Sequence, residues 1–199
     1  MADVSAPCPV KYFVAILFRE PAQAAAAIAS TKQRWGDIDF EGADHLFDVT
    51  DYYEPEMGAP LYRRLVTFGE LMSPAALVDM KLACNDIEEH LASQGKRTVN
   101  LDAGYLDHNK TLLASAKEAG QKVYLDKGIY ADLAGRYKKG KYQPFEWSFP
   151  DFRDGRYDAE LLQVRAAYMA QLKQWRRKGA RKNLNGEKLK EVLLNFQQS

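Results

Sequence analysis

Cysteine and histidine are scarce in this chain of 199 residues, which has two cysteines and three histidines. Cys8 and Cys84 form no C-x-x-C pair, so the sequence has neither a disulfide framework nor the spacing of a zinc site. We predict that both thiols are unpaired and structural. His45, His90 and His108 lack the mutual spacing that is typical of a metal site or a catalytic triad.

Long apolar runs and an excess of either charge are also missing. No stretch approaches the ~20 apolar residues that a membrane span requires. The N-terminus, MADVSAPC, lacks the cationic start and apolar core of a signal peptide. With 28 basic and 27 acidic residues, no overall field draws the protein towards nucleic acid or membrane. We therefore expect a cytoplasmic protein without membrane attachment.

What the sequence does contain is enough apolar material for one full core. A chain of this length with 46% hydrophobic residues predicts a single domain. We place this α+β domain at residues 1–175. Residues 176–199 are predicted to form a basic, glycine-broken linker and an amphipathic C-terminal helix.

Hydrophobic periodicity predicts alternating strands and helices. In the first half we expect strand 10–18, helix 21–35, strand 46–50, strand 61–68, helix 73–91 and strand 98–101. This β-α-β-β-α-β order is that of a ferredoxin-like, split βαβ unit. In the second half we expect helix 108–119, strands 122–125, 129–137 and 142–145, and helix 157–177. These strands would extend the sheet in antiparallel fashion, and the long helix would cap it.

The segment from Asp48 to Gly58 is the first candidate site, because it places four carboxylates between two apolar runs. Asp51 is a candidate general base. Asp51, Glu54 and Glu56 are weak candidates for a divalent cation, although their spacing fits no EF-hand loop and we predict no dedicated metal site. Solvated loop carboxylates are the alternative interpretation.

Tyrosine and arginine side chains flank these carboxylates. Tyr52 and Tyr53 alternate in direction if the strand continues, so one packs inward and the other can offer its hydroxyl to a ligand. Arg63 and Arg64 alternate in the same way on the following strand. A guanidinium group that faces a cleft suits a phosphate or a carboxylate. An ion pair with Asp51 or Glu54 is the alternative role of either arginine.

A second candidate site begins at Asn100. Asn100 and Asp102 share one face of a strand, Gly104 permits close approach of a backbone, and a following helix start would offer N–H groups to an anion. Asp102 is the second candidate base. Tyr105 and Lys110 are candidate ligand contacts. Ordinary turn and capping chemistry is the alternative interpretation.

A third candidate site surrounds an Asp-Lys-Gly interruption between two strands. This interruption predicts a hairpin turn with Gly128 in a left-handed conformation. Lys127 and Tyr130 are candidate ligand contacts beside it. We interpret Trp147 and Phe149 as closure of the core, because base-stacking aromatic residues require a neighbouring basic groove.

One combination of motifs is specific enough to indicate a family. The motifs are TDYY at 50–53, EMG at 56–58, Arg63, VNLD at 99–102, GYL at 104–106, KGIY at 127–130 and WSFPD at 147–151. Together they resemble a prokaryotic family, domain of unknown function 4416. The resemblance covers residues 10–172 and implies no particular function or cofactor, and the basic tail after Arg176 lies outside it.

Three functional classes remain open from the sequence. The first is an enzyme or binding protein for a small anionic molecule, phosphorylated or nucleotide-like, in a polar cleft. The second is an RNA- or ribosome-associated module. The third is a scaffold that associates with a partner, or with a second copy, through the C-terminal helix. The basic residues available to RNA are Arg176, Arg177, Lys178, Arg181 and Lys182.

The ferredoxin-like prediction separates the two acidic candidates. In a split βαβ unit we expect the loop at Asp51 and the turn at Asp102 to lie at opposite ends of the sheet. One shared site then requires residues 105–130 to fold back towards the acidic loop, or a different topology. Otherwise the chain has two sites.

Overall fold

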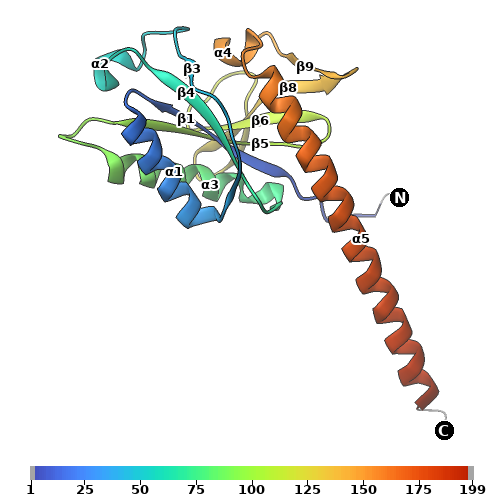
Figure 1. Ribbon diagram of the computed structural model, residues 1–199. Helices are drawn as coiled ribbons and strands as arrows, with labels where there is room; N and C mark the ends of the chain where they lie inside the picture. The colour runs from blue at the N-terminus through green and yellow to red at the C-terminus, as the bar shows by residue number, and fades with distance from the viewer. Residues whose placement is uncertain (1–2, 197–199) are drawn as a thin grey trace.

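An antiparallel sheet is the centre of the computed structural model, which describes residues 3–196 and their side chains as far as Lys178 (Figure 1). Its strands are β1 (Lys11–Phe18), β2 (Ile38–Glu41), β3 (His45–Leu46), β4 (Tyr62–Phe68), β5 (Val99–Leu106), β6 (Lys110–Ser115), β7 (Val123–Asp126), β8 (Ile129–Lys138) and β9 (Lys141–Pro144). The nine strands follow the order β2-β4-β1-β5-β6-β8-β7, with β3 paired to β4 and β9 paired to β8. Together with its helices, the sheet makes an α+β fold.

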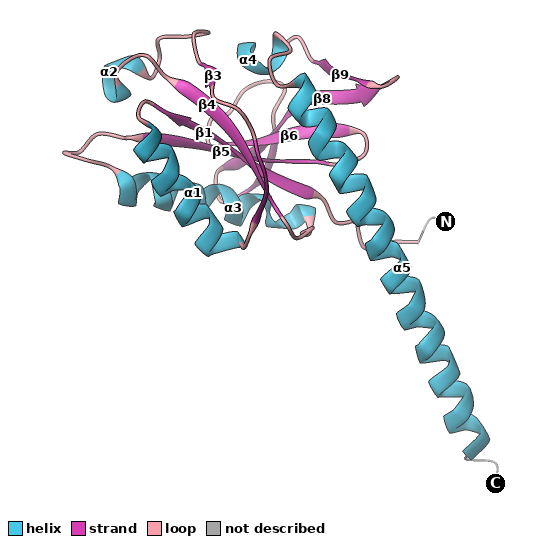
Figure 2. Cartoon of the chain, viewed as in Figure 1, coloured by secondary structure: helices cyan, strands magenta, loops and turns pink. Residues whose placement is uncertain are grey.

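Helices cover both faces of this sheet (Figure 2). The helical segments are α1 (Pro21–Trp35), α2 (Glu54–Met57), the 3-10 turn η1 (Pro74–Ala76), α3 (Leu77–Leu91), α4 (Pro150–Arg153) and α5 (Asp158–Phe196). On one face, Val14 and Ile16 of β1 pack in one cluster with α1 and α3. On the other face, Phe13 and Ala15 pack with residues of α5. The prediction of a central strand covered on both faces is confirmed, since all of β1 is buried.

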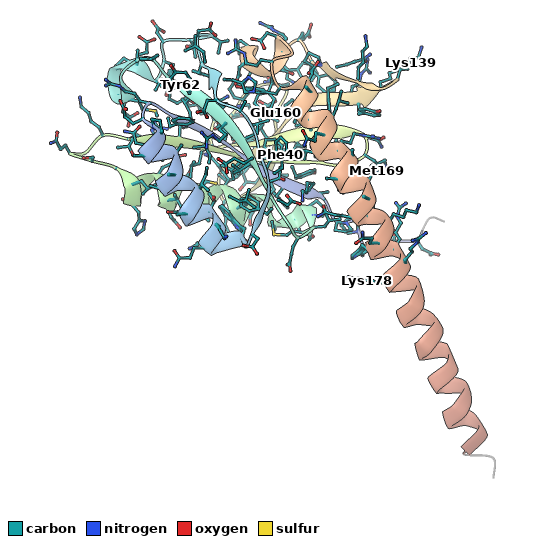
Figure 3. The ribbon with its side chains drawn as sticks, in the orientation of Figure 1. Phe40, Tyr62, Lys139, Glu160, Met169 and Lys178 are labelled. Atoms are coloured by element: carbon teal, nitrogen blue, oxygen red, sulfur yellow. The ribbon has the colours of Figure 1, made fainter. Side chains whose placement is uncertain are left out.

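The first part of α5 is fixed to the edge of the sheet that carries β2 and β3. Phe40 of β2 packs against the cluster that contains the apolar side of α5. Glu160 accepts a hydrogen bond from the N–H of Ala43 at 2.9 Å and lies 2.8 Å from Nε2 of His45 (Figure 3). These contacts hold the first part of α5 against the sheet.

Beyond Lys178, α5 continues as a helix and leaves the sheet (Figures 1 and 3). The helix is continuous through residues 176–182, so the predicted glycine-broken linker is not seen there. A single glycine costs about 1 kcal/mol relative to alanine and does not by itself end a helix. The division of the chain at residue 175 stays a prediction.

The prediction of the second strand at residues 46–50 is wrong. β2 follows α1 directly and pairs with β4, whereas β3 spans just two residues. Ile38 and Phe40 alternate with acidic residues over four positions, and such a short alternation is a weak signal. The strand conformation of β2 is stabilised by its pairing with β4, which the local sequence pattern does not reveal.

The prediction of a helix at residues 108–119 is also wrong, because β6 occupies the middle of that range and no helix forms in it. Leucine and alanine favour helix in isolation. Here residues 111–114 are buried, and β6 pairs with β5 on one edge and with β8 on the other. Pairing on both edges overrides the local helix propensity.

Asp107 turns the chain from β5 into β6. Its Oδ1 atom accepts hydrogen bonds from the N–H groups of Asn109 at 2.7 Å and Lys110 at 2.9 Å, and its Oδ2 atom binds the Lys110 ammonium group. Burial alone would raise the pKa of Asp107, but these hydrogen bonds outweigh it, and the pKa lies below its usual value.

We predict that Asp107→Asn lowers the free energy of unfolding at pH 7 by about 1–2 kcal/mol. Because folding lowers the pKa of Asp107, its stabilisation is present above the unfolded-state pKa of about 4 and is lost as the pH falls through the folded-state value. Urea unfolding of both proteins between pH 7 and pH 3 should therefore show a difference that shrinks with acidity. A difference that is constant over this range would contradict the account, and Asp51→Asn, at an exposed position, is the matched control.

Candidate functional site

β5 and β6 pair at their turn and then separate. Their pairing runs from Leu106↔Thr111 to Gly104↔Leu113 and stops. The first residues of β5 remain paired with β1, and the last residues of β6 remain paired with β8. Residues from both separated segments line a pocket of about 260 Å³, which we call the fork pocket. It is lined by Tyr52, Tyr53, Lys81, Asn85, Glu88, Arg97, Asn100, Asp102, Ala114, Ser115, Ala116, Lys117, Lys122 and Phe149.

Side chains of α3 replace β6 as hydrogen-bond partners of β5 within the fork. Nζ of Lys81 donates to the carbonyl oxygen of Leu101 at 3.0 Å, and the N–H of Leu101 donates to Oε1 of Glu88 at 2.7 Å. Burial raises the pKa of Glu88 above its usual value, and the charge of Lys81 opposes that rise in part. An unpaired buried strand edge would be costly, so these contacts allow the fork to stay open.

Asn100 brings an unsatisfied donor to the fork pocket. Its side chain is buried, with 4% exposed. Its Oδ1 atom accepts a hydrogen bond from Nη1 of Arg97 at 2.7 Å. Because a guanidinium group can donate but not accept, this contact fixes the orientation of the amide. Nδ2 of Asn100 is then a buried donor without an acceptor among the described residues.

Arg63 lies behind the pocket and holds Asp102. Its Nη2 atom donates to Oδ2 of Asp102 at 3.0 Å, and its Nη1 atom forms an ion pair with Asp151. The Tyr157 hydroxyl donates to the same Asp151 oxygen at 2.9 Å, and the guanidinium carbon lies 4.5 Å from the centroid of the Phe47 ring. Burial alone would lower the pKa of Arg63, but the two carboxylates raise it above its ordinary value.

Tyr52 and Lys117 lie at the exposed mouth of the pocket. Nζ of Lys117 donates to the Tyr52 hydroxyl at 2.9 Å and lies 4.3 Å from the centroid of the ring. This hydrogen bond lowers the pKa of Tyr52. In the described part of the chain, Lys117 forms no ion pair with a carboxylate, whereas Lys122 lies 3.6 Å from Asp132. Tyr53 packs inward, where burial raises its pKa to about 12.

The acidic loop and the start of β5 lie at the same end of the sheet. Phe18, the last residue of β1, is opposite both Tyr62 at the start of β4 and Val99 at the start of β5. The expectation of opposite ends is therefore wrong. That expectation places Asp102 in a turn after its strand, whereas Asp102 lies in the middle of β5.

Three basic candidates lie outside the fork pocket, each in an ion pair. Arg64 binds Asp44 at 2.7 Å and also pairs with Glu41. Lys110 binds the turn carboxylate at 107. Lys127 binds Asp79 at 2.8 Å, in the predicted hairpin turn, where Lys127 and Gly128 both have positive φ.

Three further candidates pack against neighbouring side chains or backbone. A Cβ atom on Gly104 would lie 2.5 Å from the Leu112 carbonyl oxygen. The space beside this glycine is therefore filled by the neighbouring strand β6, and no ligand can occupy it. The ring of Tyr105 lies 5.6 Å from that of Tyr12. The ring of Tyr130 packs on Tyr124 at 5.4 Å.

The acidic loop brings no metal site together. Asp51 and Glu54 are exposed, and Glu56 forms an ion pair with Arg97 at 2.9 Å. Within the described residues, no group of three or more histidine, cysteine, aspartate or glutamate side chains could hold a metal ion.

Sequence reasoning misses several residues that line the pocket. Lys81 lies one helical turn before Cys84 and Glu88 one turn after it, both on the otherwise apolar side of α3. Charged residues within an apolar stripe are the signal that could have identified them. Arg97, Lys117 and Lys122 lie outside regular elements and carry no comparable signal. Phe149, interpreted as core closure, is 41% exposed and lines the pocket.

The basic run on α5 lies partly outside the described side chains. Arg176, Arg177 and Lys178 are exposed, whereas Arg181 and Lys182 fall outside that description. Binding of RNA through this run, and association of copies through the end of α5, stay predictions. Over the part of the chain that the structure describes, no helix is both long enough and apolar enough to cross a membrane.

Comparison with known proteins gives one match. A family model described as a domain of unknown function (DUF4416) matches residues 8–168, which include all the lining residues of the fork pocket. No curated protein and no solved structure matches the chain.

Proposed function

The chain belongs to the DUF4416 family, whose description names no function, and from the fork pocket we propose that it binds a small anionic molecule. The observation that carries the proposal is Nδ2 of Asn100, a buried donor without an acceptor. Leaving such a donor unsatisfied costs about 1–3 kcal/mol. An oxygen atom of a bound phosphate or carboxylate would satisfy it.

The charges around this donor favour an anion. Lys117 forms no ion pair with a carboxylate within the described residues, and one of its three donors is used by Tyr52. Arg97 and Lys122 add positive charge, although each also binds a carboxylate. Lys117 therefore remains the cation most available to a ligand.

The size of the pocket favours a small molecule. Its volume of about 260 Å³ lies just below the range of roughly 300–1,000 Å³ that is usual for ligand sites. Tyr52 and Phe149 are exposed beside it and can cover an apolar or planar part of the ligand. A phosphorylated metabolite or a small carboxylic acid fits this space, and a nucleotide would extend over the exposed aromatic residues.

Calorimetric titration with propyl phosphate and with butyrate tests the proposal. We expect saturable binding of at least one probe, weakened about tenfold by Lys117→Ala, because a hydrogen bond to a charged group contributes about 1.5–3 kcal/mol. The matched control is Lys127→Ala, which removes a lysine that is paired with Asp79 outside the pocket. Equal weakening by both variants, or failure of the wild-type protein to bind any of the small phosphate and carboxylate probes, would refute the proposed site.

We also propose that the first half of the fold is a ferredoxin-like, split βαβ unit. Supporting this, the strand order β2-β4-β1-β5 is antiparallel throughout, α1 lies between β1 and β2 in the chain, and α3 lies between β4 and β5. β6 to β9 then extend the sheet beyond β5.

A further inference from the structure

We infer that the ligand of the fork pocket carries, besides its anionic group, a hydroxyl or ammonium group that donates a hydrogen bond to Asp102. This inference rests on the proposed function and narrows it to a chemical class. The class consists of small molecules with an acidic group at one end and a hydrogen-bond donor a few bonds away, such as phosphorylated polyols or amino alcohols.

Asp102 presents an unused acceptor to the pocket. Its Oδ2 atom is bound by Arg63, whereas its Oδ1 atom has no hydrogen-bond partner within the described residues. The side chain is 23% exposed and lines the pocket. A carboxylate oxygen can only accept a hydrogen bond, so its complement in a ligand is an O–H or N–H group.

The network behind the pocket holds this acceptor in place. Arg63 is 3% exposed and bridges Asp102 to Asp151, which is 1% exposed and also binds the Tyr157 hydroxyl. Asp102 therefore cannot turn towards Lys117 without leaving a buried guanidinium group with one partner fewer. The acceptor is positioned before any ligand arrives, which reduces the cost of binding.

The donor and the acceptor of the pocket have a defined spacing. Asn100 and Asp102 lie opposite Leu17 and Ala15 of β1, so both face the same side of β5. Alternate residues of a strand are about 7 Å apart. This distance suits an anionic group at Asn100 and a donor group three or four bonds away at Asp102.

The other carboxylate of the pocket is already satisfied. Glu88 accepts hydrogen bonds from the N–H of Leu101 at 2.7 Å and from Arg97 at 3.5 Å. Asp102 is therefore the acceptor that a ligand would use. A plain anion at Asn100 would gain nothing from Asp102 and would be repelled by its charge.

Two matched pairs of probes and one variant test the inference. Glycerol 3-phosphate and propyl phosphate share the phosphate group and the three-carbon chain, and differ in the two hydroxyl groups. We expect the wild-type protein to bind glycerol 3-phosphate at least tenfold more tightly, measured by calorimetry. Phosphoethanolamine against ethyl phosphate makes the same comparison for an ammonium donor.

Asp102→Asn should change the two affinities in opposite directions. The amide oxygen can still accept from Arg63, and the amide nitrogen then faces the ligand as a donor. Binding of glycerol 3-phosphate should weaken about tenfold, and binding of propyl phosphate should tighten. A purely structural role of Asp102 would move both affinities together. Asp126→Asn, at an exposed position outside the pocket, is the control.

The outcomes separate the inference from the proposed function. Equal affinity of the wild-type protein for both probes, or a parallel change of both in Asp102→Asn, overturns the inference and leaves anion binding in place. Failure of all four probes to bind the wild-type protein overturns both. If Asp102→Asn does not fold, the preference of the wild-type protein decides alone.

Discussion

Replacing Asp151 with alanine is expected to lower the free energy of unfolding by about 3–5 kcal/mol, because it leaves the buried Arg63 without its closest partner. Arg63 is 3% exposed and Asp151 is 1% exposed, so the ion pair is shielded from bulk water. The Tyr157 hydroxyl loses its acceptor in the same variant. Urea unfolding at neutral pH measures the effect.

A double variant distinguishes two contributions to this loss of stability, the missing ion pair and the buried charge that is left unpaired. Arg63→Met combined with Asp151→Leu removes both buried charges and fills the space with apolar groups, so it should be more stable than Asp151→Ala alone. Asp154→Ala is the control, since that aspartate follows α4 at an exposed position and binds Arg156. A double variant less stable than Asp151→Ala would show that the network stabilises by more than charge compensation.

Replacing Gly104 with alanine is expected to cost about 3 kcal/mol, at the upper end of overpacking effects. The new Cβ atom would lie 2.5 Å from the Leu112 carbonyl oxygen and 2.6 Å from Cζ of Phe13. Backbone cannot move aside as a flexible side chain can, so β5 and β6 would have to separate at the last pair that joins them. Chemical unfolding should show the loss, and the amide exchange of β6 should accelerate.

Gly120→Ala is the matched control for Gly104. A Cβ atom at position 120 meets nothing within 4 Å, and this glycine is not among those with positive φ. Its replacement should change stability by less than about 0.5 kcal/mol. A similar loss of stability at the two positions would contradict the explanation that Gly104→Ala is costly because β5 and β6 lie so close together.

Local pattern predicts those elements whose periodicity is long. β1 is visible in the sequence because its apolar run is long and unbroken, and α3 because its apolar stripe repeats at helical spacing over several turns. In β2 the alternation comprises only two apolar residues, which is too short a signal to predict a strand. In β6 the leucine and alanine residues favour helix locally, so the local pattern predicts a helix. The strand state of β2 and β6 follows from pairing with residues that lie far away in the sequence.

The site is predicted in part for the same reason. Asn100, Asp102 and the two tyrosines line the fork pocket, and the sequence points to them because they stand at polar positions beside apolar strand segments. The fork itself depends on where β5 and β6 stop pairing, which no local pattern records. Lysines at 117 and 122 look like ordinary surface residues until the fork brings them beside Asn100.

Binding of an anion in the fork pocket can be followed at the side-chain amide of Asn100. We propose to record nitrogen–proton correlation spectra of the labelled protein during titration with glycerol 3-phosphate. We predict that the Nδ2 protons of Asn100 shift saturably, with the same midpoint as the backbone amide of Lys117. Shifts confined to residues outside the pocket, or an Asn100 amide that stays unchanged up to saturation of the protein, would contradict it.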